Sequence, residues 1–490
     1  MRRRPPEPPS LYPGHHLMAF RRSPVKFLAR VQRDHGDFVR FWLGPQPTYV
    51  VSDPEAIRDV LVAQADAFTK GPALRRAKVS LGEGLLTSEG DFHKRQRRLA
   101  QPAFHATRVA AYGRTMAAYA DRVAAGWVDG GVVDVHAAMT RLTLEIVAKA
   151  LFDADLGRQV DDIGEAMSRS VAMFTRAQLP FGELLGRLPL RSNRQFNASW
   201  GRLEALVQGF IVDRRRDVAA GAGADRNDLL SLLLRATDVE GGGGGMTDQQ
   251  LRDECITLFT AGHETTANAL AFALHLLAHH PDVQQRMQAE VDGVLRGANA
   301  EVGTSNVESK TADAAPPSVR HSTFPLRHVL PRLPTAADAA DRLPYTRAVF
   351  AEAMRLYPPA WTVGRQATRD VTIGPRRDVV PAGGVLLLSQ WVAHRDPRWW
   401  PDPLAFRPER FTDGSDAARP RYAYFPFAGG PRSCIGEAFA WLEGVIALAT
   451  VCSRWSLRPT TRSHWNDLPL AATITLRPAC PLPLRCHRRQ

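Results

Sequence analysis

The stretch that decides the fold is Phe425–Gly436, which reads FPFAGGPRSCIG and is followed from Ala438 by an apolar, helix-compatible run. Gly430 and Gly436 allow backbone amides to approach the sulfur of Cys434, and a helix start adds positive potential there. Both effects favour a thiolate, so the stretch is typical of a metal centre with one protein sulfur ligand. The alternative is a buried structural cysteine, the usual role of a free thiol. We assign that structural role to the remaining cysteines, which are Cys255, Cys452, Cys480 and Cys486.

The spacing Phe427-x-x-Gly430-x-Arg432-x-Cys434-x-Gly436 resembles the haem-binding loop of the cytochrome P450 family, the haem-thiolate monooxygenases. The resemblance implies that Cys434 binds the iron of haem b (iron protoporphyrin IX). It also implies that Phe427, Arg432 and Gly436 contact this cofactor. Three further motifs occur in the family's order, so the resemblance covers the chain from about residue 25 onward.

The second motif is Glu352-x-x-Arg355, whose side chains share one face of a predicted helix because they are three residues apart. Taken alone, such a pair is equally typical of a surface ion pair. A later Pro-Glu-Arg-Phe segment supplies Arg410 as a third partner. The resemblance implies a structural network of Glu352, Arg355 and Arg410 that holds the core beneath the haem.

The third motif, Ala261–Thr266, reads AGHETT within a long predicted helix. It is not a zinc-protease helix, because Ala267 stands where the second histidine would be. Threonine hydroxyls can bond back to helix carbonyls and open a groove for a small ligand. The resemblance implies that Glu264 and Thr265 deliver protons to bound dioxygen and that Ala261 lies against the haem. The alternative is a kinked core helix with a buried hydroxyl.

The fourth motif is the basic segment Gly90–Leu99, which contains His93 and Arg97 four residues apart on one helix face. By composition this cluster would be a solvated helix face or, less often, a nucleic-acid patch. The resemblance implies instead that His93 and Arg97 bind a haem propionate. It adds Arg365 and Arg432 as further propionate partners, because the carboxylates of a buried cofactor need matched cations.

The predicted fold class is mainly α with a small β lobe, and the resemblance implies the cytochrome P450 fold in a single haem-containing domain. We expect residues 1–24 to be a Pro/Arg-rich N-terminal segment, residues 25–490 to be the haem domain, and about 298–335 to be a flexible insertion. The glycine run 241–245 is expected to be a flexible connector. Helices are predicted from the Thr247 cap to about His280 and over 344–357, where Pro358 follows. The expected strands are Phe38–Trp42, Thr48–Val51, Val385–Leu388 and Ala472–Leu476.

The chain of 490 residues carries 63 basic and 50 acidic side chains, a net charge of +13, which favours acidic partners. No nucleic-acid motif accompanies this charge, so no nucleic-acid partner is predicted. No apolar run is long enough to span a membrane, and no apolar stretch follows the basic N-terminus as in a signal peptide. Five sparse cysteines do not suggest a secreted disulfide framework. A cytoplasmic monomer is therefore expected.

The resemblance implies a monooxygenase that inserts one atom of O2 into a C–H bond of a lipophilic small molecule. Electrons are expected from NAD(P)H through a ferredoxin- or flavodoxin-type donor and its reductase. Two alternatives remain: a haem-thiolate peroxygenase or isomerase, and a non-catalytic haem protein. The candidate substrate-facing residues carry no charged anchor, which leaves a fatty acid, a terpenoid or a polyketide; they are Ala261, Thr265, 362–364 and 468–472.

Overall fold

The computed structural model describes residues 5–157, 163–164, 190–221, 226, 228–238, 243–296, 332–415 and 417–489. Residues 298–331 of the expected insertion and the first two glycines of the expected connector lie outside these ranges. At the end of the insertion Arg332 Nη1 donates to Asp338 Oδ2 at 2.6 Å. Residues 332–335 therefore return to the body of the protein through a charged hydrogen bond.

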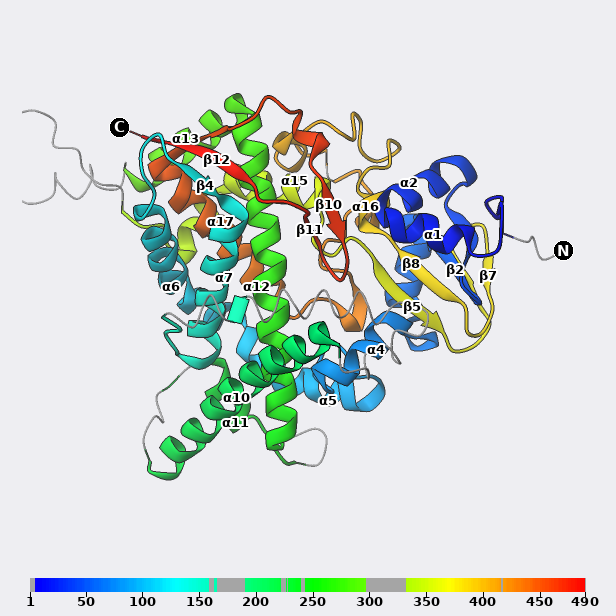
Figure 1. The fold of residues 1–490 in the computed structure, drawn as a ribbon, viewed down its shortest axis with the longest axis horizontal. Coiled ribbons are helices and arrows are strands. Elements are labelled where there is room, and N and C mark those ends of the chain that lie inside the picture. Colours follow the sequence, from blue (N-terminus) through cyan, green and yellow to red (C-terminus); the bar gives the residue numbers. More distant parts are fainter. Residues whose placement is uncertain are drawn as a thin grey trace, which may run out of the picture.

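Helices dominate the described residues (Figure 1). The α-helices are α1 (His15–Arg22), α2 (Pro24–His35), α3 (Pro54–Arg58), α4 (Pro72–Leu81), α5 (Gly90–Ala100), α6 (Ala106–Ala125), α7 (Val135–Phe152), α10 (Arg191–Ala219), α11 (Leu229–Arg235), α12 (Asp248–His279), α13 (Pro281–Leu295), α15 (Pro344–Leu356), α16 (Gln390–Ala393) and α17 (Glu437–Arg454). Short helical turns are η1 (Asp59–Ala63), η2 (Ala65–Ala67), η3 (Gln101–Phe104), η4 (Asp338–Arg342), η5 (Pro408–Phe411), η6 (Arg421–Ala423), η7 (Gly430–Arg432) and η8 (Trp465–Asp467).

The central element is α12, which runs through the middle of the molecule in Figure 1. It begins where predicted, because Thr247 and Gln250 form a reciprocal capping box that satisfies two free backbone amides. It ends at His279, before Pro281 begins α13. The helix packs along α7 and also against α10, α15 and α17, so most of its 32 residues are buried. The predicted helix over 247–280 is confirmed.

Two further helices position the site. The predicted helix over 344–357 is α15, which ends at Leu356, just before Pro358. Its second half is buried on all sides, Glu352 and Arg355 included. The second helix, α17, begins directly after Gly436 and is buried from Glu443 to Ser453. Cys434 therefore precedes the first turn of a core helix, as the sequence indicated.

The strands are β1 (Phe38–Leu43), β2 (Gln46–Val51), β3 (Phe68–Lys70), β4 (Val132–Asp134), β5 (Val363–Ala367), β6 (Val371–Ile373), β7 (Asp378–Val380), β8 (Val385–Leu388), β9 (Trp455–Pro459), β10 (Leu470–Ala472), β11 (Leu476–Pro478) and β12 (Pro483–Arg488). The largest sheet has the order β1-β2-β8-β5-β3, in which only β2 and β8 are parallel. It lies beside α1 and α2, to the right of the helices in Figure 1. A second sheet has the order β4-β12-β9, and β6-β7 and β10-β11 form hairpins.

Three of the four expected strands are confirmed as β1, β2 and β8, and the fourth, Ala472–Leu476, is wrong. These residues form the turn between β10 and β11, which pair antiparallel with Ala472 opposite Leu476. Thr473 N donates to Thr475 O at 3.0 Å and closes the turn. The alternating pattern of side chains predicted a strand, but the backbone groups within this segment bond one another and not a neighbouring strand. The segment is therefore a turn.

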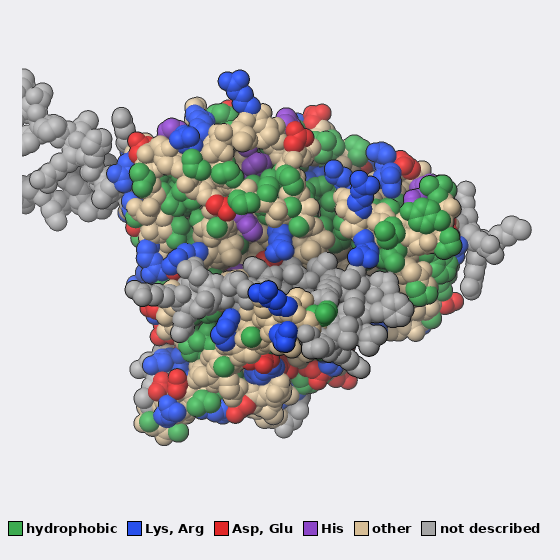
Figure 2. Space-filling view, in the orientation of Figure 1, with side chains coloured by type: hydrophobic (Ala, Val, Ile, Leu, Met, Phe, Trp, Pro, Cys, Tyr) green, Lys and Arg blue, Asp and Glu red, His purple; other side chains and the backbone are tan. Residues whose placement is uncertain are grey.

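None of the helices in the described ranges is both long and apolar enough to cross a bilayer. On the face drawn in Figure 2, Lys and Arg side chains are dispersed among acidic and apolar ones and do not gather in one continuous stripe. A net charge of +13 therefore does not by itself define a polyanion-binding surface on that face.

Candidate active site

The loop before α17 is shaped by contacts with a distant turn. Gly430 has φ +70°, and a Cβ added to it would lie 1.8 Å from the carbonyl oxygen of Leu61 in η1. Only glycine fits there. At Gly436 an added Cβ would meet Cys434 Sγ at 4.0 Å, an ordinary contact. The expectation that both glycines serve close approach to the sulfur is therefore wrong, because Gly430 instead accommodates the Leu61 carbonyl.

Cys434 itself is exposed and free, and its amide donates to Phe427 O at 3.0 Å. Although the residue is partly open to solvent, the protein atoms packed around the sulfur desolvate it and raise the pKa of the thiol to about 11. A hydrogen bond from the Gly436 amide and the charge of Arg97 lower the pKa but do not offset burial. The expected backbone contribution is present at Gly436, but burial outweighs it in the protein alone. A metal cation bound at the sulfur would supply the missing stabilisation, since a thiol that coordinates a metal loses its proton.

Basic side chains from four elements gather beside this loop. They are Lys70 on β3, His93 and Arg97 on α5, Arg365 on β5 and Arg432 in η7. Lys70 and Arg365 are direct partners in the antiparallel ladder, where like charges repel. Burial, followed by the charges of the other four members, lowers the pKa of His93 to about 3.

The cluster has little negative charge to balance it. Glu89 accepts from Arg432 Nη2 at 2.7 Å and from the Lys70 amide. The nearby carboxyl of Glu254 has its pKa raised to about 8, chiefly by burial, so it is mostly protonated at neutral pH. Burial lowers the pKa of Lys70 to about 7 and that of Arg365 to about 10. Buried cations of this kind require anionic partners.

One donor in the cluster has no partner. His93 is 6% exposed, and its Nδ1 lies 3.2 Å from Ser88 Oγ, but its Nε2 forms no hydrogen bond although it is buried. Arg97 Nη1 donates to Ser433 O at 2.7 Å and so ties α5 to the cysteine loop. Two carboxylates presented here would neutralise the cluster and could use the free ring nitrogen. These residues therefore fit the propionates of a haem whose iron is held by Cys434.

Sequence reasoning named His93, Arg97, Arg365 and Arg432, and the structure brings all four together. It missed Lys70, whose Nζ donates to Leu85 O and Ser88 O, each at 2.7 Å. A lysine in a strand of only three residues carries no local signal of burial. Its position becomes informative only once β3 is seen to pair with β5, the strand of Arg365.

The middle of α12 carries a run of small and polar residues, Ala261 to Thr266. Ala261 is exposed and Thr265 half-buried, within a helix that is otherwise largely buried. Thr265 Oγ1 donates to Ala261 O at 2.9 Å, and Thr266 Oγ1 to Gly262 O at 3.2 Å. The predicted back-bonding is present, but α12 continues unbroken, so the expected opening of the helix does not occur.

The predicted network behind the site is also assembled. Glu352 accepts from Arg355 Nε at 2.7 Å and Nη2 at 2.8 Å, and both side chains are completely buried. Arg410 Nε lies 3.4 Å from Glu352 Oε1. Arg355 also donates to three backbone carbonyls, those of His394, Pro403 and Ala405. The network fastens α15 to the segment that leads toward the cysteine loop.

Comparisons with known proteins point to one family. A model of the cytochrome P450 family matches residues 5–309 and 326–479. Cyclooctatin synthase from Streptomyces melanosporofaciens is 37% identical over 445 residues, covering 91% of this chain and 88% of that protein. Cyclooctat-9-en-7-ol 5-monooxygenase from the same organism is 35% identical, with 91% and 87% covered. Pentalenene oxygenase from Streptomyces avermitilis is 32% identical, with 94% and 93% covered.

A solved structure gives the same result for the fold. The chain superposes on a crystal structure of a cytochrome P450 with a TM-score of 0.81 and 28% sequence identity, over 100% of both chains. The predicted fold class, mainly α with a small β part, is confirmed.

Proposed function

Because the chain belongs to the cytochrome P450 family, a family of haem-thiolate monooxygenases, we propose that it hydroxylates a C–H bond of an unsaturated terpenoid. The balanced reaction converts R–H, O2, two electrons and two protons into R–OH and H2O. The observation that carries the proposal is the cluster of five basic side chains beside the Cys434 loop, three of them buried, whose charge Glu89 balances only in part. The haem, when bound, supplies dioxygen activation, and thiolate ligation favours cleavage of the O–O bond.

The chain's own residues hold the cofactor and move protons. Cys434 Sγ would bind the iron, and the cluster of Lys70, His93, Arg97, Arg365 and Arg432 would hold the propionates, with His93 Nε2 as an unpartnered ring nitrogen. Phe427 packs against Trp441 of α17, with ring centroids 5.8 Å apart, and supports the loop from behind.

Glu264 and Thr265 are the proposed proton-transfer pair. The Thr265 hydroxyl now donates to a helix carbonyl, and its rotation frees the O–H without breaking α12. The adjacent Glu264 carboxyl takes up protons and passes them toward the hydroxyl. A hydroxyl and a carboxyl on neighbouring residues thus provide the two protons that the reaction consumes.

Terpenoids are chosen among the three open substrate classes for two reasons. The candidate substrate-facing residues 362–364 and 468–472 are small or apolar and half-buried apart from Pro469, which is exposed, and none offers a cation to a carboxylate. By their names, two relatives act on pentalenene and on cyclooctat-9-en-7-ol, an alkene and an unsaturated alcohol. A fatty acid would leave its carboxylate without a partner among these residues.

The test is product formation from pentalenene, taken as a probe terpenoid, under ¹⁸O2 with NADPH and a ferredoxin–reductase pair. We expect one labelled oxygen atom per product molecule and the second label in water. Product formed with hydrogen peroxide alone, and none with O2 and NADPH, would identify a peroxygenase. An unlabelled isomer would identify an isomerase. If none of a panel of terpenoids shifts the spin state or yields product, the terpenoid proposal is wrong.

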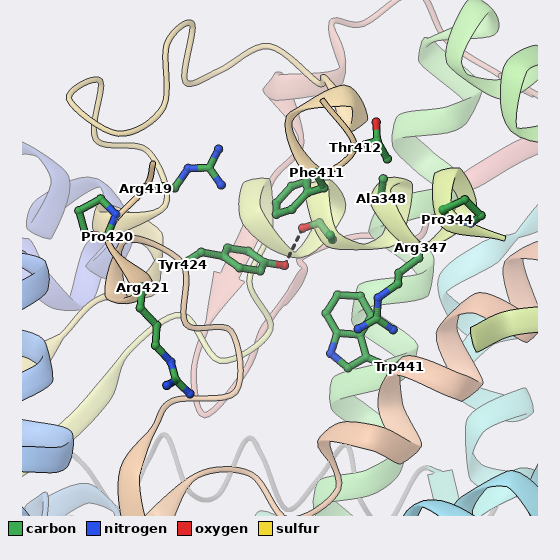
Figure 3. Close-up of a pocket in the computed structure, with 11 residues that line it drawn as sticks. Pro344, Arg347, Ala348, Phe411, Thr412, Arg419, Pro420, Arg421, Tyr424 and Trp441 are labelled. Carbon is green, nitrogen blue, oxygen red and sulfur yellow. Dashed lines mark hydrogen bonds between the residues drawn. The ribbon is translucent and has the colours of Figure 1, made fainter. Parts of the chain in front are cut away.

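The electron donor is proposed to dock at a pocket of about 400 Å³ on the surface between α15, α17 and the segment that leads into the cysteine loop (Figure 3). Arg347, Arg419 and Arg421 line it. The Arg347 guanidinium lies over the Trp441 ring at 4.1 Å, and Trp441 in turn contacts Phe427 of the cysteine loop. Three arginines this close to the loop suit an acidic ferredoxin or flavodoxin.

Charge reversal at this pocket is expected to slow electron delivery. Arg421→Glu should lower the second-order rate constant for reduction by a plant-type ferredoxin about tenfold at low salt, because it removes electrostatic steering. The loss should shrink as ionic strength rises. The control is Arg216→Glu on α10, another exposed arginine, which lies outside the pocket. Equal rates for the two variants at low salt would contradict docking at this pocket.

We further propose that residues 25–490 form one haem-binding domain and that the protein acts as a monomer. Cytoplasmic localisation remains a prediction of the sequence.

A further inference from the structure

The carboxylate of Glu264 is held by a residue from a distant part of the chain. Thr475, which directly precedes β11, donates its hydroxyl to Glu264 Oε1 at 2.7 Å. Thr475 is only 5% exposed. A charged hydrogen bond at a nearly dry position is among the stronger ones in a protein. It fixes the carboxylate of the proposed proton-transfer pair toward the β10–β11 hairpin.

This hydrogen bond is the last of a series of three, and in each of them the donor lies on the side away from Glu264. An ionised carboxylate only accepts, so the Thr475 hydroxyl donates to it and its lone pair accepts from Asn268 Nδ2 at 3.5 Å. Asn268 Oδ1 then lies 2.9 Å from His136 Nε2 of α7, which donates. Asn268 is completely buried and follows Glu264 by four residues, so the two lie on the same face of α12. Every donor in the series points toward the carboxylate.

Backbone contacts of the turn hold Thr475 in place. Trp361 Nε1 donates to Thr473 O at 3.0 Å, and Leu476 N donates to Pro359 O at 2.8 Å. These two bonds clamp the turn onto the segment that follows α15. The same hairpin contains residues 470–472, which are proposed to face the substrate. The hydroxyl is therefore rigidly presented to Glu264 from the substrate side of α12.

We propose that Thr475 is a positioning residue for Glu264: its hydroxyl, oriented by Asn268 and His136, holds the carboxylate where it exchanges protons with Thr265. This inference rests on the proposed function of the pair. Without the bond the carboxylate turns away, and dioxygen that has received two electrons takes up two protons and leaves as H2O2. The electrons from NADPH then appear in peroxide and not in product and water.

The experiment compares Thr475→Val, which is close in shape but lacks the hydroxyl, with Thr475→Ser, which keeps it. Holoenzyme, NADPH, a plant-type ferredoxin and its reductase are used without organic substrate, and H2O2 is measured per NADPH consumed. Without substrate, O2 is reduced either to H2O2, which consumes one NADPH per O2, or to water, which consumes two NADPH per O2. We expect Thr475→Val to lower the ratio of water to H2O2 about tenfold, as suits the loss of a hydrogen bond to a charged group.

A rescuing variant and a matched control distinguish the loss of the hydrogen bond to Glu264 from a general loss of structure. Thr475→Ser should return to the wild-type ratio, and Thr461→Val, which removes an exposed hydroxyl bonded to Ser463 in the loop before η8, should leave that ratio unchanged. Glu264→Gln should raise the H2O2 share as well, and adding Thr475→Val to it should change nothing further. A Thr475→Val ratio equal to wild type, or one that Thr475→Ser does not rescue, would overturn the inference.

A second readout does not depend on activity. In a double-variant cycle followed by urea unfolding of the holoenzyme, Thr475→Val and Glu264→Leu, which removes the accepting oxygen, together should lose less stability than the sum of their separate losses. Additive losses would show that the bond is not formed in solution and would overturn the inference. Non-additive losses with an unchanged H2O2 share in Glu264→Gln would confirm the bond and show that the proposed role of Glu264 had failed.

Discussion

Replacing Cys434 by alanine is expected to abolish the strongly red-shifted Soret band of the reduced, carbon monoxide-treated protein. That band reports a thiolate bound to haem iron, and Cys434 is the cysteine placed between the basic cluster and the first turn of α17. Monooxygenation should fall below detection, because thiolate donation to the iron is lost. The measurement is the absorption difference spectrum of purified protein at equal haem content.

The matched control is Cys480→Ala, which removes another exposed free thiol. It should leave the band and the activity unchanged. A red-shifted band that survives in Cys434→Ala would assign the ligand to a different cysteine, and a Soret band at the ordinary position in the wild type would show that the sulfur is not ligated as a thiolate.

Replacing Arg355 by leucine is expected to lower the free energy of unfolding by about 3–5 kcal/mol. Arg355 is completely buried and makes five hydrogen bonds, two of them to the buried Glu352. The substitution leaves a carboxylate in the core with only Arg410 and the Arg407 amide nearby. Such a loss is a large part of the net stability of an ordinary domain.

Urea unfolding of the purified holoenzyme measures this effect. Asp213→Ala is the control, because it breaks an exposed pair of the same i,i+3 spacing on α10 and should cost at most about 0.5 kcal/mol. Arg355→Lys should fall between the two, since it keeps a charge but loses the planar fork. A loss in Arg355→Leu no greater than in the control would contradict a core role for the network.

Local signals account for much of what the sequence predicted. The Thr247 cap and the proline after His280 bound α12, and the prolines after Tyr357 bound α15. These boundaries depend on residues within one turn, so they can be read without tertiary information. The cysteine loop is likewise a local pattern followed by a helix.

The sequence predictions that were wrong, and the residues that were missed, involve contacts between distant parts of the chain. The expected strand Ala472–Leu476 became a turn that is clamped by the Pro359 carbonyl and the Trp361 ring nitrogen, more than a hundred residues earlier. Gly430 is required by the Leu61 carbonyl, which no spacing rule relates to it. Thr475 carries no motif, and it joins the candidate site only because β11 returns beside α12.

The order of the largest sheet has a consequence for how the chain is made on the ribosome. Strand β2, completed at Val51, pairs in parallel with β8, which begins at Val385, and β3 pairs with β5 at Val363–Ala367. At a synthesis rate of about 5–20 residues per second, β2 and β3 remain without these partner strands for roughly 15–60 s. During that interval the nascent edges stay open to wrong pairing. Lys70 on β3 and Arg365 on β5 come together only after β5 has been translated, so the basic cluster is completed late in synthesis.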